Sequence, residues 1–219
     1  MEHEIFRKQI VEAGKYLLSS GLVVRTWGNI SLRVDETYML ITPSGRRYED
    51  LALIDLVLVN YHTLDYKSSI KPSSETELHS AIYCSRNEIN AVIHTHQQYA
   101  SAVAVAGKKI PAITDDQAQI LGASVRLAKY ALTGSKQLVN NTLNALKDRM
   151  AALMSNHGAI CLGRNLDEAF TACQMLEKTS KIFIDAQALG GVKPIKKSLA
   201  TQLHLDYLNN YSVKALKNV

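Results

Sequence analysis

The chain has 219 residues, 47% hydrophobic and 21% charged, a balance that is typical of globular proteins and excludes a disordered or fibrous chain. Its formal net charge is +5, but the basic residues occur as scattered pairs rather than as a block, so we expect no nucleic-acid partner. The length allows one domain that buries roughly 70% of the surface of the unfolded chain.

The N-terminal part of the chain predicts a helix followed by strands. Residues 1–20 carry Glu and Lys throughout and lack the apolar core of a signal peptide. Apolar residues recur there at three- and four-residue intervals from Phe6 to Leu17, and Gly21 follows as a helix stop. Three short β-like runs separated by turn residues come next, at 30–34, 38–42 and 56–60.

The rest of the chain alternates between helical and strand patterns. Ser135 is suited to cap a helix, and Gly190 and Gly191 are suited to end one. The expected helices are 76–86, 97–106, 135–146, 167–189 and one from 198, and the expected strands are 90–94, 150–154 and 159–162. Without a repeat or a long linker, this order predicts a single domain over 1–219, an α/β/α sandwich with a central, mainly antiparallel or mixed sheet.

The cysteines and the hydropathy pattern indicate a compartment. Cys84, Cys161 and Cys173 form no C-x-x-C pair, and an odd number argues against a disulfide framework. No stretch approaches the roughly 20 apolar residues of a membrane span. We therefore expect a soluble cytoplasmic protein with no membrane partner.

Two histidines one residue apart give the first chemical signal. His94 and His96 lie at the end of the apolar run 90–94, and alternate residues of a strand point to the same side, so both imidazoles can converge on one point. Neutral imidazole is a common zinc ligand, and a catalytic zinc typically has three protein ligands and one open position. The pair therefore needs a third partner.

His157 is the candidate third ligand. It lies in the turn between two expected strands, and Gly158 follows it without side-chain bulk. A lone His-x-His motif can also be an accident of a surface strand, so the interpretation depends on the three together. The other histidines have no comparable context, and we interpret them as surface or packing residues: His3, His62, His79 and His204.

The segment 71–75 combines a helix start with an acid. Ser73 and Ser74 can cap the helix that follows, and a helix N-terminus with serine hydroxyls can bind a phosphate. Glu75 could complete the metal coordination or act as a general base. The alternative is an ordinary helix cap with an acidic residue, and Glu75 with His79 could be a surface pair one turn apart.

Two glycine-containing turns, at 26–31 and 42–45, fit the same idea. Each can offer backbone N–H groups beside a small hydroxyl or amide, as a phosphate site requires, although each is also simply a good turn sequence. Neither matches a nucleotide P-loop or a Rossmann glycine fingerprint, which disfavours a nucleotide cofactor.

Taken together in order, these motifs resemble the class II aldolase and adducin-head superfamily over about residues 7–189. The segments that carry the resemblance are Gly28-Asn29-Ile30-Ser31, Thr42-Pro43-Ser44-Gly45, Pro72-Ser73-Ser74-Glu75, His94-Thr95-His96 and Asn156-His157-Gly158. The resemblance implies an α/β/α domain that forms a homotetramer with active sites between subunits. It also implies one Zn²⁺ per subunit, or another divalent cation, held by His94, His96 and His157, with Glu75 able to touch the metal.

The resemblance further implies a reaction. Members most similar to this chain cleave a ketose 1-phosphate such as L-fuculose 1-phosphate to dihydroxyacetone phosphate and a small aldehyde such as L-lactaldehyde. A doubly charged cation can hold the resulting enediolate through two oxygens. Glu75 would move the proton on the enediolate carbon, and a tyrosine of the C-terminal tail, Tyr211 or else Tyr207, would serve the aldehyde oxygen. The implied phosphate ligands are Gly28, Asn29, Ser44, Gly45, Ser73 and Ser74.

Departures from the family pattern leave the aldehyde open. Thr114 stands where relatives carry an active-site tyrosine, and Thr133 replaces an aromatic residue. Asp115 or Asp116 could add an acid/base group or could belong to a solvated turn. Three alternatives share the fold: a methylthioribulose-1-phosphate dehydratase, a ribulose-5-phosphate 4-epimerase, which usually has Asp in place of Glu75, and a non-catalytic adducin-like binding domain.

Overall fold

The computed structural model describes residues 2–211 and their side chains as far as residue 210. One eight-stranded sheet runs through the molecule in the order β3-β2-β1-β4-β8-β7-β6-β5. Neighbouring strands are antiparallel except for β6 and β7, which are parallel. The strands are β1 (Asn29–Arg33), β2 (Tyr38–Ile41), β3 (Val57–Asn60), β4 (Ala91–Thr95), β5 (Ile110–Pro111), β6 (Ser124–Ala128), β7 (Ala151–Met154) and β8 (Gly158–Gly163).

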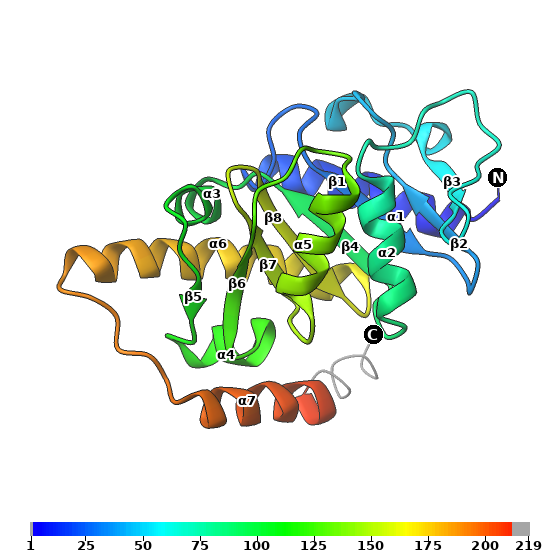
Figure 1. Cartoon of the computed structure of the whole chain (residues 1–219). Coiled ribbons are helices and arrows are strands. Elements are labelled where there is room, and N and C mark those ends of the chain that lie inside the picture. The colour runs from blue at the N-terminus through cyan, green and yellow to red at the C-terminus, as the bar shows by residue number, and fades with distance from the viewer. Residues whose placement is uncertain (1, 212–219) are drawn as a thin grey trace.

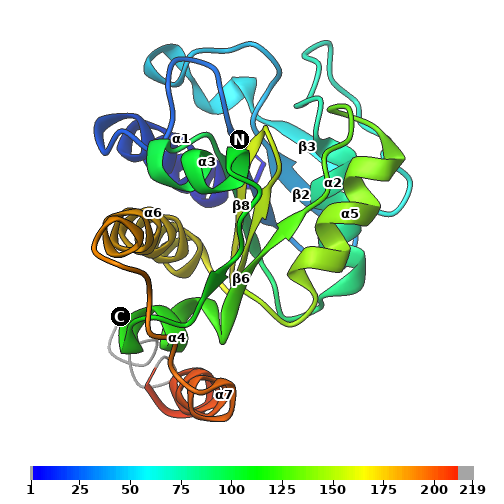
Figure 2. The same cartoon turned by 60° about the vertical axis from the view of Figure 1, so that its left-hand side comes forward.

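Helices cover both faces of this sheet. The helices are α1 (Glu4–Ser19), α2 (Thr76–Ser85), α3 (Gln98–Val105), α4 (Asp115–Leu121), α5 (Lys136–Leu146), α6 (Leu166–Ala188) and α7 (Lys197–Asp206), with short turns η1 (Tyr48–Asp50), η2 (Leu53–Asp55) and η3 (Tyr207–Tyr211). Helices α1, α3 and α6 lie on one face, and α2 and α5 lie on the other (Figure 2). Helix α7 packs along α4 beyond the β5 and β6 end of the sheet (Figure 1).

The two cores explain why the central strands are apolar throughout. Every residue of β4, β7 and β8 is buried, because helices cover these strands on both sides. One core contains Leu17, Ile93 and Leu176, and the other contains Ile82, Val92 and Leu138. The predicted α/β/α sandwich with a mixed, mainly antiparallel sheet is confirmed.

Most element boundaries fall within one or two residues of the prediction, but one region was missed. The segment 107–134 had no predicted element, and it forms β5, α4 and β6. These are a two-residue strand containing Pro111, a seven-residue helix, and a strand with the partly exposed Arg126. Such short elements carry too few residues to show a period. None of the helices within residues 2–211 combines the length and apolarity needed to cross a membrane.

Candidate metal centre

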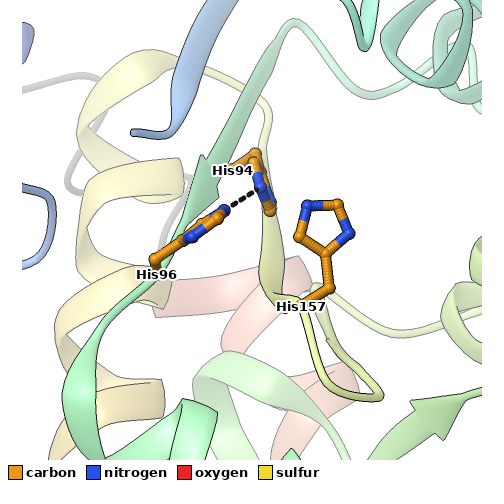
Figure 3. Close-up of side chains that lie close together, drawn as sticks. All are labelled: His94, His96 and His157. Atoms are coloured by element: carbon orange, nitrogen blue, oxygen red, sulfur yellow. Dashed lines mark hydrogen bonds between the residues drawn. The ribbon is translucent and has the colours of Figure 1, made fainter. Parts of the chain in front are cut away.

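Three imidazoles converge at one end of the central strands. His94 lies on β4, His96 immediately follows it, and His157 lies in the turn between β7 and β8 (Figure 3). The Nε2 atoms of His94 and His96 are 2.8 Å apart, and one nitrogen from each ring lies within 4.8 Å of the others. The ring of His157 lies 4.8 Å from that of His94 and 5.2 Å from that of His96, centroid to centroid. The structure therefore brings together the three predicted ligands.

The protonation of His94 follows from its backbone contact. Its Nδ1 lies 2.8 Å from the carbonyl oxygen of Ala159 on β8. A carbonyl only accepts hydrogen bonds, so Nδ1 carries a proton, and in the neutral tautomer that this contact selects the lone pair is on Nε2. That lone pair points at the other two histidines. A carbonyl partner on the far nitrogen is the arrangement that orients metal-binding histidines in proteins.

Burial and neighbouring imidazoles hold the other two rings neutral. Burial, together with His94 and His157, lowers the pKa of His96 to about 4. Burial and the neighbouring His94 also lower the pKa of His157. Both imidazoles are therefore unprotonated near neutral pH, which is the form that binds a cation.

The segment that carries His96 is fixed by buried contacts. Gln97 is buried, its Oε1 accepts a hydrogen bond from the Thr95 hydroxyl at 2.8 Å, and its amide nitrogen donates to the carbonyl of Cys173 on α6 at 3.1 Å. The Glu177 carboxylate accepts from the first backbone N–H groups of α3. The residues on either side of His96 are therefore anchored, Thr95 by its bond to Gln97 and Gln97 by its bond to α6.

Glu75 closes the cluster from the opposite side. Its carboxylate is 4% exposed, and its Oε2 lies 3.2 Å from Nε2 of His94 and accepts from the Asn29 amide at 2.9 Å. Its Oε1 lies 3.6 Å from Nε2 of His157 and has no hydrogen-bond partner among the described residues. Burial acts to raise the pKa of Glu75, but His94, His157 and the Asn29 hydrogen bond outweigh it and lower the pKa.

The donor atoms of the three histidines and Glu75 form a set that a cation could bind. A buried carboxylate oxygen without a donor is costly, and it faces imidazole nitrogens that offer lone pairs. A divalent cation among three histidine nitrogens and one carboxylate oxygen would satisfy both requirements, and this donor set is one that zinc accepts. The site therefore fits a divalent cation.

Two glycines allow the close approach of the strands that carry the ligands. A Cβ on Gly158 would lie 2.3 Å from the carbonyl oxygen of Thr95 and 3.1 Å from the His96 ring. Gly28 has a φ of +93°, and a Cβ there would lie 2.7 Å from the His94 carbonyl oxygen. Gly158 was expected to leave room beside His157, and Gly28, expected only as part of an anion-binding turn, leaves room beside His94 in the same way.

A cavity of about 450 Å³ joins the metal ligands to the predicted anion-binding turns. Ser73, whose hydroxyl accepts from the backbone N–H of Glu75 at 3.2 Å, lies just before α2. Trp27 stands over His96 with 5.7 Å between ring centroids, and Thr133 also lines the cavity. All six residues expected to hold phosphate line it: Gly28, Asn29, Ser44, Gly45, Ser73 and Ser74.

The other residues considered as acid/base groups do not line this cavity where the structure describes their side chains. Asp115 and Asp116 form the first turn of α4, and Asp116 pairs with Lys178 at 2.5 Å instead of lining the cavity. Tyr207 begins η3 and lies near Met150 and Leu162. The side chain of Tyr211 lies outside the described residues.

Of the two interpretations left open for His79, a surface or a packing residue, the structure supports the second. His79 is completely buried, so it does not form a surface pair with Glu75. Its Nε2 lies 2.6 Å from Oδ1 of Asn29, and its Nδ1 lies 2.7 Å from the Ser31 hydroxyl. Its position one helical turn after Glu75 places both on the same face of α2, and that spacing was the available signal.

Residues 8–184 match the model of the class II aldolase and adducin N-terminal domain. The chain belongs to this family. The predicted family resemblance is thereby confirmed, over a stretch that contains every residue of the histidine centre.

Three relatives within the class II aldolase family illustrate the match. The chain is 36% identical to the 5-deoxy-D-ribulose 1-phosphate aldolase of Bacillus thuringiensis serovar kurstaki, over 85% of this chain and 88% of that protein. It is 31% identical to the L-fuculose phosphate aldolase of Escherichia coli, over 98% of this chain and 99% of that protein. A solved L-fuculose 1-phosphate aldolase superposes with a TM-score of 0.90 at 29% identity, covering 94% and 98% of the two chains.

Proposed function

We propose that the protein is a divalent-cation-dependent lyase that cleaves a ketose 1-phosphate into dihydroxyacetone phosphate and a small aldehyde. The observation that carries this proposal is the buried Glu75 carboxylate, which faces His94 and His157 and has one oxygen without a hydrogen-bond partner in the part of the chain that the structure describes. An acid held at a cation site inside a cavity with anion-binding turns has what carbon–carbon cleavage next to a carbonyl requires.

His94, His96 and His157 would hold the cation, for which zinc is our candidate, and Glu75 would complete the ligand set before substrate enters. When bound, the cation supplies a Lewis acid that stabilises negative charge developing on substrate oxygens. The Asn29 amide holds Oε2 of Glu75. Glu75 then moves a proton at the substrate carbon that was bonded to the aldehyde fragment.

The phosphate would bind at the turns that line the same cavity. Gly45 has a φ of +71° and lies in a turn beside Ser44, while Ser73 and Ser74 precede the N-terminus of α2. Backbone N–H groups of such turns and of a helix N-terminus attract anions. We assign Gly28, Asn29, Ser44, Gly45, Ser73 and Ser74 to this role.

The part of the cavity that would hold the aldehyde fragment of the substrate contains fewer of the predicted residues. Thr133 lines it, and this position is one where the sequence departs from the aromatic residue of the family pattern. We assign the proton transfer at the aldehyde oxygen to Tyr211, with Tyr207 second. Because Tyr207 lies away from the cavity of its own subunit, this assignment rests on a tetramer in which the tail of one subunit completes a neighbouring site.

L-fuculose 1-phosphate is our first candidate substrate, since a relative with that activity in its name aligns over 98% of this chain. A 5-deoxyribulose 1-phosphate is the second candidate, because the 36% identical relative acts on such a compound by name. Retention of Glu75 and the three histidines supports an enzyme over an adducin-like binding domain.

The test is an assay of dihydroxyacetone phosphate release, followed through a coupled reductase, on L-fuculose 1-phosphate, 5-deoxyribulose 1-phosphate, methylthioribulose 1-phosphate and ribulose 5-phosphate. We expect release from at least one ketose 1-phosphate, lost by more than about 100-fold in Glu75→Gln. Glu77→Gln, two residues further on and half-buried, is the matched control. Dehydration or epimerisation without cleavage would refute the proposal.

A further inference from the structure

A chain of buried hydrogen bonds leads from the core to Glu75. It starts at Tyr83 and passes through Ser31, His79 and Asn29 before it reaches the carboxylate. The successive separations are 2.8 Å, 2.7 Å, 2.6 Å and 2.9 Å. All five side chains are buried, and Tyr83, Ser31 and His79 are completely so.

The direction of each bond can be worked out from its two ends. The ionised Glu75 carboxylate only accepts, so the Asn29 amide presents its nitrogen to Glu75 and its oxygen to His79. An amide oxygen also only accepts, which requires a proton on Nε2 of His79. Burial lowers the pKa of His79 to about 3, so the ring is neutral near pH 7 and its Nδ1 accepts from Ser31.

The hydrogen bonds at the Tyr83 end of this series run in the same direction, with each donor on the side away from Glu75. The Ser31 hydroxyl uses its one proton on His79 and must therefore accept from the Tyr83 hydroxyl. Tyr83 is held in place by its ring contact with the Arg33 guanidinium, 4.9 Å from the ring centroid. Every donor in the chain thus points toward Glu75.

We infer that His79 is a positioning residue that fixes the orientation of the Asn29 amide and, through it, the orientation of Glu75. The inference rests on the proposed function only for its kinetic consequences. If Asn29 were turned over, its oxygen would face the carboxylate and would repel it. Asn29 also lines the cavity, so the same rotation would remove an amide donor from the anion-binding side.

His79 does not line the cavity, and its side-chain hydrogen bond on that side is the one to Asn29. His79→Leu removes the donor, and we expect kcat to fall about 10- to 100-fold, the usual effect of losing a partner behind an active-site ligand. The KM for the phosphorylated substrate should rise as well. His79→Gln can place an amide N–H near the former Nε2, and we expect it to recover most of the loss.

The outer members of the chain give graded controls. Ser31→Ala lets the proton of His79 move to Nδ1 and should weaken activity less than His79→Leu. Tyr83→Phe leaves the Ser31 to His79 bond in place and should have the smallest effect. These two variants keep the inference testable if His79→Leu fails to fold.

The deciding experiment is a double-mutant cycle with Asn29→Ala, run on metal-loaded enzyme with melting temperature and bound metal measured alongside. With no amide to orient, His79→Leu should cost little further in kcat/KM, so the effects of the two substitutions should be far from additive. Additive effects, or a loss explained by a smaller folded fraction with unchanged kcat and KM, would overturn the inference.

A second readout is independent of the reaction. NMR of wild-type protein labelled at histidine should show His79 as the neutral Nε2–H tautomer. The resonance of His79 is assigned as the one that is missing from the spectrum of His79→Gln. The Nδ1–H tautomer would overturn the inference even in an active enzyme. An Nε2–H tautomer in a protein that cleaves no sugar phosphate would overturn the proposed function and leave the positioning role standing.

Discussion

At the scale of single residues, the centre depends on which nitrogen of each imidazole carries a proton. The Ala159 carbonyl fixes this for His94, and burial keeps His96 and His157 neutral. In its neutral form each ring can offer one nitrogen lone pair to a cation. Metal binding should therefore be sensitive to each ring.

We predict that His94→Ala, His96→Ala and His157→Ala each weaken binding of a divalent cation by more than the roughly 10- to 100-fold typical of an outer-shell substitution. Metal analysis of purified protein and competition with a chelator measure this. The exposed His62, which bonds the Glu36 carbonyl, supplies the control variant His62→Ala. Full metal content in all three variants would contradict the assignment.

Gly158 gives a prediction about packing beside the ligands. The Cβ of Gly158→Ala would come within 2.3 Å of the Thr95 carbonyl oxygen, and overpacking of this kind costs about 1–3 kcal/mol of unfolding free energy. The displaced strand should also weaken metal binding. Gly21→Ala is the comparison, because residue 21 has a φ of +71°, which strains an alanine, but no other atom of residues 2–211 lies within 4 Å of the added Cβ. It should lose stability, measured by urea unfolding, while it keeps its metal.

At the scale of elements, side-chain caps hold the helices that border the centre. The Asn165 side chain accepts from the Glu168 backbone N–H at 2.8 Å at the start of α6. Asn165→Ala should lower the free energy of unfolding by about 1 kcal/mol and leave metal content unchanged. The exposed Asn140 within α5 is the control, since Asn140→Ala should be neutral or stabilising.

How far the sequence predicts this molecule also varies from element to element. Long periodic helices and the apolar strands around His94 could be predicted, because burial on one or both faces leaves a regular pattern. The short elements β5, α4 and β6 could not, since tertiary packing rather than local pattern specifies them. The histidine centre was predictable because its ligands sit at strand ends.

The role of His79 could not be inferred in the same way. Its burial depends on the packing of α2 against β1, where Ser31 and Asn29 meet it. A single histidine on a helix carries no sign of its partners on a distant strand. The one feature of the sequence that indicated a link between His79 and the site was its position one helical turn after Glu75.

At the scale of the whole molecule, buried neutral histidines tie folding to pH. The pKa of His79 is about 3 in the folded protein and about 6.5 in the unfolded chain. Between these values the unfolded chain binds a proton that the folded protein does not. The stability contribution is therefore complete above about pH 6.5 and is lost as the pH falls toward 3.

We expect urea unfolding of the metal-free protein to show a lower free energy of unfolding at about pH 5 than at about pH 7.5, with a smaller decrease in His79→Gln. Wild type and His79→Gln measured side by side give the comparison. Equal decreases in the two proteins would contradict a buried neutral His79.

If Tyr211 of one subunit completes the active site of a neighbouring subunit, activity depends on the assembly of the subunits. We predict a homotetramer, with a mass by light scattering of about four times the 24.2 kDa of one chain. Tyr211→Phe should then lower kcat by about 10- to 100-fold without changing metal content. A monomer with full activity would contradict a site shared between subunits.

The most direct test of the account is cleavage of ketose 1-phosphates before and after metal removal. We predict that wild-type protein releases dihydroxyacetone phosphate from L-fuculose 1-phosphate or 5-deoxyribulose 1-phosphate. A chelator should abolish this release, and about one equivalent of zinc or another divalent cation per chain should restore it. Release that persists in fully metal-free protein, or no release from any ketose 1-phosphate by metal-loaded protein, would contradict the account.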